Sequence, residues 1–575
     1  MLQDIYNPLD EYVNVFRDRF KDIARSTFAQ LAKEAQVDVD ANRETCKQLY
    51  ARQSELSSVT DSNKLWSNIA VILIGGIIIG IIAIFGIAEE QNKAIIVAIL
   101  ISIVIAVILL FCLVAPRIQK TTSECNRLTP IVNELQSKAW QQMEPLNRLY
   151  DWDVLVRMMS EAVPRLEFDR YFTTQRLADL EKTYGWDGGF NKERSVIYSQ
   201  SGLINGNPFV ICRTRKMNMG DKTYYGHKTI YWTTRECGAG GKTRLVRHSQ
   251  VLTASVTAPF PEYSEKTRLI YGNTAAPDLV FSRKKSGLAS KEDSFLFRYR
   301  RRKLRKKARN LDSADFAMMT NEEFEVAFDT SDRNDNQQFA LLFTPLAQQS
   351  MMSLLRDSEF GYGDDFDFFK QKMINTVIPN HLQSIELDMD PAQYRNFDYD
   401  KAEKDFYAIN ANCFRAIYFS LAPLLCIPAY QQIRPPQDIY GRDMQCDSSF
   451  WEHEALANFW GQERFKASDC VTDCILKTEQ HKEGGGSSKI TVFAHGYRAE
   501  RHLTYINRFG GDGRMHKVPV YWDEYLPVTG SGCMFIKEDF DKEDFKSHSQ
   551  RIEHISDVLG ASNFELYRRH IASKI

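Results

Sequence analysis

Two long uncharged segments, close together in the chain, constrain the fold more than any other feature. One runs from Ile69 to Ala88 and the other from Ala94 to Ala115, and only Glu89-Glu-Gln-Asn-Lys93 separates them. Each segment is about 20 residues long, which at ~1.5 Å per residue crosses a hydrocarbon core of roughly 30 Å. Buried core helices are the alternative, and the length and lack of charge of both segments argue against them. The sequence therefore predicts a transmembrane helical hairpin at residues 66–115.

Charges beside the two spans predict the orientation of this hairpin. Basic residues lie on both outer flanks, whereas the connection carries two acidic residues and one lysine. The positive-inside rule then places both termini in the cytoplasm and residues 89–93 outside. The flanking basic residues are Lys47, Arg52, Lys64, Arg117, Lys120 and Arg127.

Small residues recur on the predicted spans at helical spacing. Gly76 and Gly80 form a small-xxx-small motif in the first span, and Ala98, Ser102 and Ala106 recur at steps of four in the second. Such faces let helices approach closely in lipid, where burial from water does not drive the association of helices. They can pack the hairpin on itself or pair hairpins of a homo-oligomer, and the first is favoured because the partner span is so near in the chain.

Outside the spans, the sequence predicts a cytosolic helical stalk and two α+β domains. We expect N-terminal helices at 1–65, a stalk helix at 116–160, an α+β domain at 161–360, a helical segment at 361–435 and a second α+β domain at 436–575. The stalk helices either pack within one chain, which is the simpler interpretation, or form an oligomeric coiled coil.

Local patterns predict individual elements inside these regions. β-rich alternation favours strands at 223–234, 243–256, 473–478, 489–497 and 517–525, and aromatic-rich runs favour strands at 324–328 and 339–343. Helices are expected at 177–184, 346–355, 452–460, 545–559 and 563–574. Residues 414–427 predict a buried helix rather than a third transmembrane span, because Arg415, Pro423 and Pro428 interrupt the apolar segment.

Several short motifs between residues 65 and 360 resemble a family of bacterial two-span membrane proteins of unknown function. They are Pro164-x-Leu166-x-Phe168, Phe324-Glu-Val-Ala-Phe328, and Leu341-Leu-Phe-Thr-Pro345 followed by a helix with Met351 and Leu354-Leu355. The resemblance implies a soluble α+β domain after the spans and a bacterial source. It implies no catalytic residue.

One short segment is strongly basic although the chain as a whole is nearly neutral, with a net charge of −1. Phe297, Leu304, Ala308 and Leu311 fall on one helical stripe beside it, so the segment can form a basic helix with a thin apolar edge. Such a helix can bind anionic lipid or nucleic acid, or can be a solvated linker. Its basic residues are Arg298, Arg300, Arg301, Arg302, Lys303, Arg305, Lys306, Lys307 and Arg309.

Motifs for cofactor, metal or catalytic chemistry are weak. Gly241-Lys-Thr243 resembles the end of a phosphate-binding loop, but Glu236 stands where that loop needs its first glycine. Zinc could be bound by a set of three cysteines and one histidine, although their intervals fit no usual ligand spacing and cysteine is often a small buried hydrophobe. This candidate set is Cys446, His453, Cys470 and Cys474. We therefore expect no cofactor.

Taken together, these features predict a membrane-anchored bacterial protein with a large cytosolic region. We expect it to act without catalysis, as a binding, scaffold or membrane-remodelling module, and one specific form is a membrane effector of antiviral (phage) defence. The alternatives are an enzyme or zinc-dependent module in the C-terminal domain and a membrane-tethered nucleic-acid binder.

Overall fold

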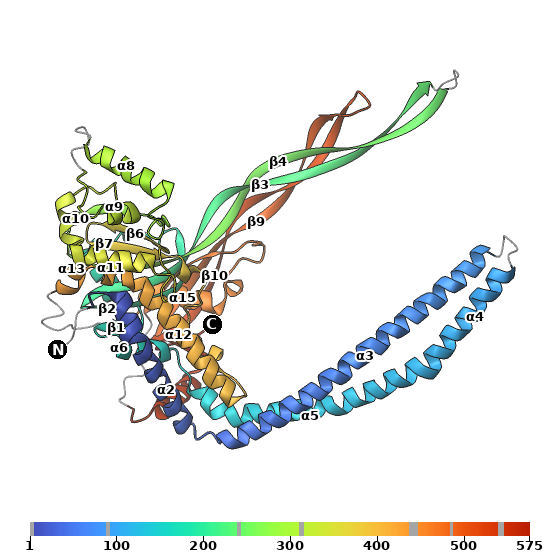
Figure 1. Ribbon diagram of the computed structural model, residues 1–575, viewed down its shortest axis with the longest axis horizontal. Coiled ribbons are helices and arrows are strands. Elements are labelled where there is room, and N and C mark those ends of the chain that lie inside the picture. Colours follow the sequence, from blue (N-terminus) through green and yellow to red (C-terminus); the bar gives the residue numbers. More distant parts are fainter. Residues whose placement is uncertain are drawn as a thin grey trace.

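Two long projections leave one side of a mixed α/β body (Figure 1). One is a pair of antiparallel helices and the other is an arm made of two β-ribbons. The computed structural model describes residues 5–87, 93–237, 243–309, 316–435, 447–482, 487–538 and 545–575.

The helical projection contains both predicted spans. Helix α3 (Val39–Ile87) runs outward, and α4 (Lys93–Leu109), a π-helical turn (Leu110–Val114) and α5 (Ala115–Leu149) return beside it. Both helical segments are long and apolar enough to cross a membrane, and no residue in the most apolar window of either is buried among the described residues. This exposure separates them from the core helices of a soluble protein.

The half of the projection nearest the body is a polar two-helix stalk. Helices α3 and α5 pack along each other there (Figure 1), with Thr121 donating to Asn63 at 2.8 Å and Thr60 lying 3.7 Å from Cys125. The stalk is therefore packed within the chain, which was the simpler of the two expectations.

The N-terminal helix belongs to the body. The amphipathic α2 (Arg17–Glu34) buries Phe20, Ile23 and Phe28, and Phe20 stacks on Phe414 with ring centroids 4.2 Å apart. Phe414 lies in α12 (Tyr399–Leu425), whose second half is almost wholly buried. The expectation of a buried helix at 414–427 is confirmed.

A seven-stranded antiparallel sheet forms the centre of the body, in the order β1-β2-β3-β4-β7-β6-β5. Helix α15 (Phe450–Trp460) packs on β2. The strands of this sheet are β1 (Leu166–Phe168), β2 (Arg194–Ile204), β3 (Asn207–Cys237), β4 (Thr243–Gly272), β5 (Val280–Arg283), β6 (Phe366–Gln371) and β7 (Ile374–Pro379).

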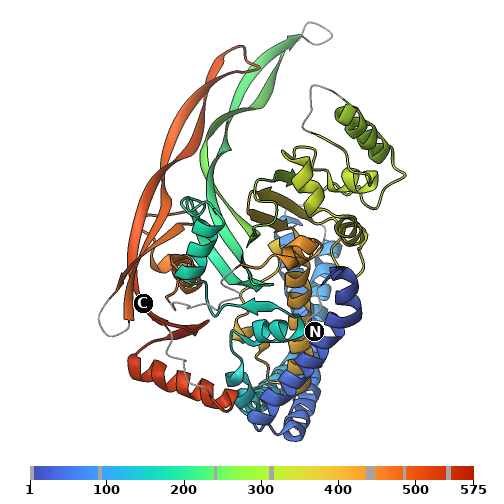
Figure 2. The same cartoon turned by 90° about the vertical axis from the view of Figure 1, so that its left-hand side faces the viewer.

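A five-stranded antiparallel sheet, in the order β11-β12-β10-β9-β8, forms the C-terminal part. Its strands are β8 (Ile475–Lys482), β9 (Ser487–Phe509), β10 (Met515–Glu538), β11 (Leu566–Arg568) and β12 (Ile571–Lys574). Helix α16 (His548–Ser562) precedes β11 and lies at the edge of the body (Figure 2).

The arm is formed where β3–β4 and β9–β10 run beyond their sheets. Strand β3 pairs with β2 only as far as Lys216, and β9 pairs with β8 only as far as His495. The two ribbons then pack face to face, and Gly226 approaches the carbonyl of Pro519 so closely that a Cβ atom would lie 1.9 Å from its oxygen. The apolar seam between the ribbons is formed by Ile230, Leu252, Ala254, Val518 and Val520.

Helices elsewhere in the body are short. They are α1 (Pro8–Glu11), followed by a π-helical turn (Tyr12–Phe16), α6 (Val154–Ala162), α7 (Thr174–Ala178) with a second π-helical turn (Asp179–Thr183), α8 (Phe295–Arg309), α9 (Glu322–Phe328), α10 (Asn336–Leu342), α11 (Pro345–Arg356) and α13 (Pro428–Gln432). Single 3₁₀ turns lie at His381–Gln383, Pro391–Tyr394 and Gln462–Arg464.

Three predictions of local structure were wrong. The aromatic runs at 324–328 and 339–343 form helices α9 and α10, because Asn321 and Asp335 cap their first turns. The segment 361–435 was expected to be helical, but its first part forms the β6–β7 hairpin. Residues 563–574 form β11 and β12, joined through Arg569 and His570 at positive φ, rather than a helix.

Candidate functional site

The small residues of the predicted spans divide into two groups in the hairpin. Gly80 faces α4, and a Cβ atom there would lie 3.1 Å from the side chain of Ile103. Gly76 meets no atom within 4 Å, and Ala98 and Ser102 are exposed, whereas Ala106 is half-buried. Gly80 and Ala106 therefore lie at the contact between the helices, and the other three predicted packing residues lie outside it.

The basic segment forms helix α8, as predicted, and its apolar edge is partly buried. Phe297 and Leu304 are buried, Ala308 is exposed, and Leu311 lies outside the described residues. The edge holds the helix against the body, so that its basic side chains face outward.

Three of the nine basic residues of α8 have partners in the body. Arg305 forms a two-pronged ion pair with Glu322 (2.8 and 2.5 Å), Arg300 pairs with Asp329, and Lys307 donates to the carbonyl of Ser331. The pair with Glu322 lowers the pKa of that carboxyl group through the hydrogen bond from Arg305. Six basic residues have no acidic partner within ion-pairing distance among the described residues: Arg298, Arg301, Arg302, Lys303, Lys306 and Arg309.

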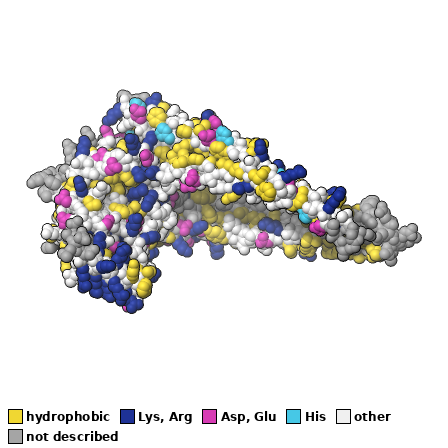
Figure 3. All heavy atoms as spheres, turned by 90° about the horizontal axis from the view of Figure 1, so that it is seen from above, with side chains coloured by type: hydrophobic (Ala, Val, Ile, Leu, Met, Phe, Trp, Pro, Cys, Tyr) yellow, Lys and Arg dark blue, Asp and Glu magenta, His cyan; other side chains and the backbone are white. Residues whose placement is uncertain are grey.

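Helix α8 lies on the side of the body opposite to the place where α3 and α5 leave it (Figures 1 and 2). In the view from above, Lys and Arg side chains gather at this end of the molecule (Figure 3). The basic surface and the apolar hairpin are thus well separated.

The candidate zinc ligands do not form a metal site among the described residues. Cys470 and Cys474 are buried with their Sγ atoms 3.6 Å apart, but no group of three or more potential ligands is found in the described part of the chain. Cys446 lies outside the described residues. Burial, with the hydrogen bond from Cys470, raises the pKa of the Cys474 thiol to about 12, so in the absence of a metal this thiol is protonated.

His453 belongs to a buried polar run on α15 that joins this helix to β2. Glu452 accepts from the Phe172 amide (2.8 Å) and from Ser199 (3.0 Å). Glu454 accepts from Val196 N (2.9 Å), from Asn191 Nδ2 (3.0 Å) and from Lys477 Nζ (2.9 Å). Burial raises the pKa of Glu454, although the ion pair with Lys477 opposes this. The Glu452-His453-Glu454 run therefore has a packing role.

The buried Ser448 does not form a catalytic triad with His453. Its hydroxyl lies 2.8 Å from His453 Nε2 and also donates to Glu538. In a triad the carboxylate orients the second ring nitrogen, but His453 Nδ1 has no hydrogen-bond partner in the described structure. Because Ser448 and His453 are both buried, a substrate could not reach the hydroxyl.

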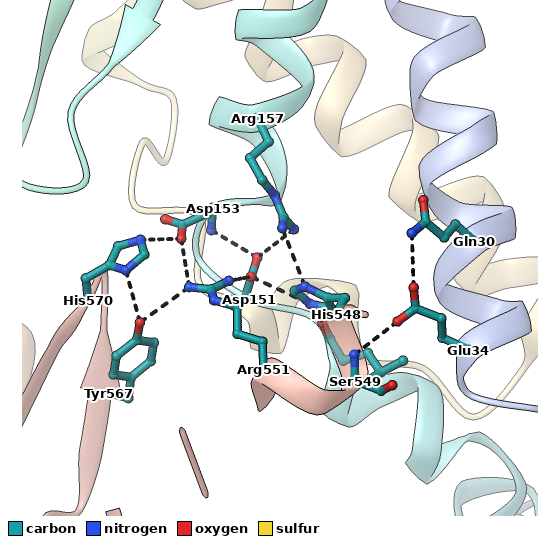
Figure 4. Close-up of polar contacts among 11 residues, drawn as sticks. Gln30, Glu34, Asp151, Asp153, Arg157, His548, Ser549, Arg551, Tyr567 and His570 are labelled. Carbon is teal, nitrogen blue, oxygen red and sulfur yellow. Dashed lines mark hydrogen bonds and ion pairs between the residues drawn. The ribbon is translucent and has the colours of Figure 1, made fainter. Parts of the chain in front are cut away.

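A polar cavity of about 530 Å³ lies where the N-terminal helices meet the C-terminal part. Asp151 and Asp153, just before α6, bind Arg551 of α16 at 2.5 and 3.3 Å (Figure 4). His570 Nε2 lies 2.6 Å from Asp153, and the Ser549 amide donates to Glu34 of α2 at 3.0 Å.

This arrangement balances its own charges. Burial acts to raise the pKa of Asp153, but the charge and hydrogen bond of His570, together with Arg551 and Arg157, hold it well below its ordinary value. Asp153 therefore stays ionised at neutral pH, and both aspartates are held in ion pairs with Arg551. The cluster therefore joins α2, α6 and α16, which lie hundreds of residues apart in the chain.

Comparisons of this chain with protein-family models, with curated proteins and with solved structures gave no match. The resemblance to two-span bacterial membrane proteins therefore stays a prediction.

One feature was missed by sequence reasoning. Strands were predicted at 223–234 and 243–256, but nothing in the local pattern indicated that β3 and β4 are about 30 residues long, or that they leave the sheet as a ribbon. The phosphate-loop similarity falls on residues 238–242, which lie outside the described residues. The strand β4 that follows is the opposite of the helix which such a loop requires.

Proposed function

We propose that this chain is an integral membrane protein anchored by its helical hairpin, with the body in the cytosol of a bacterium. One observation carries the proposal: the two most apolar segments form an antiparallel pair that leaves the body and is buried by no described part of it. In water this surface would be a severe aggregation liability, whereas in a bilayer it is the expected exterior.

The orientation follows from charge. Basic residues precede and follow the apolar pair on the stalk side, so the stalk and body face the cytoplasm and only the short connection lies outside. The protein therefore does not sense the exterior through a folded domain.

We propose that the body acts without catalysis, by binding or scaffolding a partner or by remodelling the membrane. Supporting this, the Glu and His side chains of α15 and the nearby Ser448 are buried with structural partners, and the aspartates at the polar cavity are held in ion pairs with Arg551. Anchoring raises the effective concentration of the body at the membrane without any chemistry. A membrane effector in antiviral defence is one specific form, in which a cytosolic trigger reorganises the hairpins.

Alkaline extraction of membranes tests the anchor. We expect the full-length chain to stay in the membrane pellet, and a variant with residues 66–115 replaced by a short Gly-Ser linker to enter the supernatant. The stalk helices are retained in that variant, so it also controls for peripheral attachment through the body. Release of the full-length chain would contradict the proposal.

The basic helix α8 supports a second candidate role, as the binding surface for a soluble anionic partner such as nucleic acid. The observation that favours it is position, because α8 faces away from the hairpin and six of its cations have no acidic partner in the described chain. Anionic lipid is the alternative ligand, and binding of α8 to the membrane would require the body to tilt toward the bilayer. Binding of short RNA and of phosphatidylglycerol vesicles, each measured against salt, separates the two ligands.

A further inference from the structure

The β3–β4 ribbon of the arm has one face that no described residue covers. Along this ribbon the odd-numbered residues from Thr223 to Arg235 pair with the odd-numbered residues from Leu245 to Thr257. Side chains of such pairs lie on one face, because successive side chains of a strand alternate. The even-numbered face packs on the β9–β10 ribbon, so the odd-numbered face is the outer one.

Every residue of this outer face is exposed, and none is acidic. Tyr225 and Tyr231 are 77% and 78% exposed, and Leu245 and Val251 are 65% and 57% exposed. The face consists of Thr223, Tyr225, His227, Thr229, Tyr231, Thr233, Arg235, Leu245, Arg247, Ser249, Val251, Thr253, Ser255 and Thr257.

The ribbon is also electropositive. Residues 222–237 and 243–257 contain five basic side chains and one acidic side chain. Amphipathic tyrosines beside basic groups are typical of the membrane–water interface, where the ring meets the acyl boundary and the charge meets anionic head groups. Of the basic residues, Arg235 and Arg247 lie on the outer face, whereas Lys222, Lys228 and Arg244 lie on the even-numbered face.

The arm is long enough to reach a membrane that the hairpin crosses. The polar part of α3, from Val39 to the start of the first span, is 30 residues and therefore about 45 Å long. The free part of β3, from Met217 to Cys237, is 21 residues and therefore about 70 Å long. Both project from the same side of the body (Figure 1), so the arm extends toward the leaflet that the hairpin enters.

We infer that the outer face of the β3–β4 ribbon contacts the anionic head groups of the leaflet through which the hairpin passes. This inference rests on the proposed anchor. The arm meets the interface and does not enter the hydrocarbon core, because the free edges of β3 and β4 carry unpaired backbone groups that lipid cannot satisfy. The arm and the hairpin then hold the body to the bilayer at two separate places.

Photo-crosslinking of the full-length protein in nanodiscs tests the inference. We would place a benzophenone amino acid at Tyr231 on the outer face, at Phe111 in the second span, or at Leu341 on the exposed surface of α10. The discs contain phosphatidylcholine with or without phosphatidylglycerol, both carrying a clickable acyl chain. Phe111 reports the anchor, and Leu341 reports random collision with lipid.

We expect lipid adducts at Phe111 in both discs and at Tyr231 chiefly in the anionic disc. At Leu341 we expect neither of these adduct yields in either disc. Replacing Arg235 and Arg247 with Gln should lower the Tyr231 adduct about fivefold or more without changing that of Phe111. The matched control replaces Arg302 and Lys303 of α8 with Gln, which removes equal charge far from the arm and should leave Tyr231 unchanged.

The outcomes separate the two proposals. Lipid adducts at Phe111 with none at Tyr231 would overturn the contact of the arm and leave the anchor in place. Tyr231 adducts that form with a second copy of the chain, or equally in both discs, would also overturn it. Absence of lipid adducts at Phe111 would overturn the anchor itself.

Discussion

A buried lysine in the central sheet allows a sharp prediction about pH and stability. Lys370 lies on β6, is 1% exposed and donates from Nζ to the carbonyl of Ala275 at 3.0 Å. Burial lowers the pKa of its amine to about 7. The folded protein therefore holds this amine largely neutral above pH 7, whereas the unfolded chain stays protonated to about pH 10.

The sign of the effect follows from proton binding. Between pH 7 and pH 10.5 the unfolded state binds more protons than the folded state, so the free energy of unfolding rises with pH over this window. The contribution is complete above about pH 10.5 and is lost as pH falls through about 7. The gap between 10.5 and about 7 corresponds to about 5 kcal/mol, at ~1.4 kcal/mol for each tenfold change in the protonation equilibrium.

Replacing Lys370 with Met removes the titrating group while keeping most of its volume. At pH 6 we expect the variant to be more stable than the wild type, because the cost of charging a buried amine exceeds the roughly 1–3 kcal/mol lost with the hydrogen bond to Ala275. Near pH 10 the order should reverse, because the neutral amine keeps that bond. Thermal unfolding of the full-length protein in detergent, followed from pH 6 to pH 10, measures the difference.

The control variant is Lys372→Met, which changes an exposed lysine two residues away. Its unfolding temperature should differ from the wild type by a pH-independent amount. A Lys370→Met difference that is also flat from pH 6 to pH 10 would refute the reasoning about the buried amine.

Three further predictions follow from the described contacts. Gly80→Leu should disrupt packing of the hairpin and lower the yield of folded protein extracted in detergent, whereas Gly76→Leu should leave this yield unchanged. Equal effects of the two variants would place the helix contact elsewhere. Glu325→Gln should lower the free energy of unfolding, measured with a chemical denaturant, by about 3–5 kcal/mol, because it leaves the buried Arg333 without its ion-pair partner. Glu322→Gln at the surface should lower it by at most ~1 kcal/mol. Similar values for the two variants would contradict the role of burial. Metal analysis of the purified protein should find zinc well below one ion per chain, and stoichiometric zinc would revive the cysteine site.

Features with a strong local signal were predictable from the sequence. The hairpin needs only a count of uncharged residues, and α2 shows its buried face through the spacing of Phe20, Ile23 and Phe28. Helix α8 was predictable in form, because Phe297 and Leu304 mark the edge that packs on the body.

Other features depend on contacts that no local pattern specifies. The aromatic run Phe324–Phe328 has the composition of a strand, yet it forms a helix capped by Asn321, and its rings join a cluster with Phe281, Phe339 and Phe343. The polar cavity brings Asp153 to His570 across more than 400 residues, and the free length of the arm depends on where β2 and β8 stop. The nine basic residues of α8 were found, but their division into paired and unpaired groups needed the positions of acids on neighbouring elements.

The central claim, that the hairpin crosses a membrane with the body on one side, is tested most directly by protease protection in vesicles of both orientations. In inside-out vesicles the account predicts digestion of the body and survival of one small fragment that contains residues 69–115. In right-side-out vesicles it predicts a full-length chain, because only the connection at 89–93 is outside. Digestion of the body in right-side-out vesicles, or complete loss of the fragment in inside-out vesicles, would contradict the account.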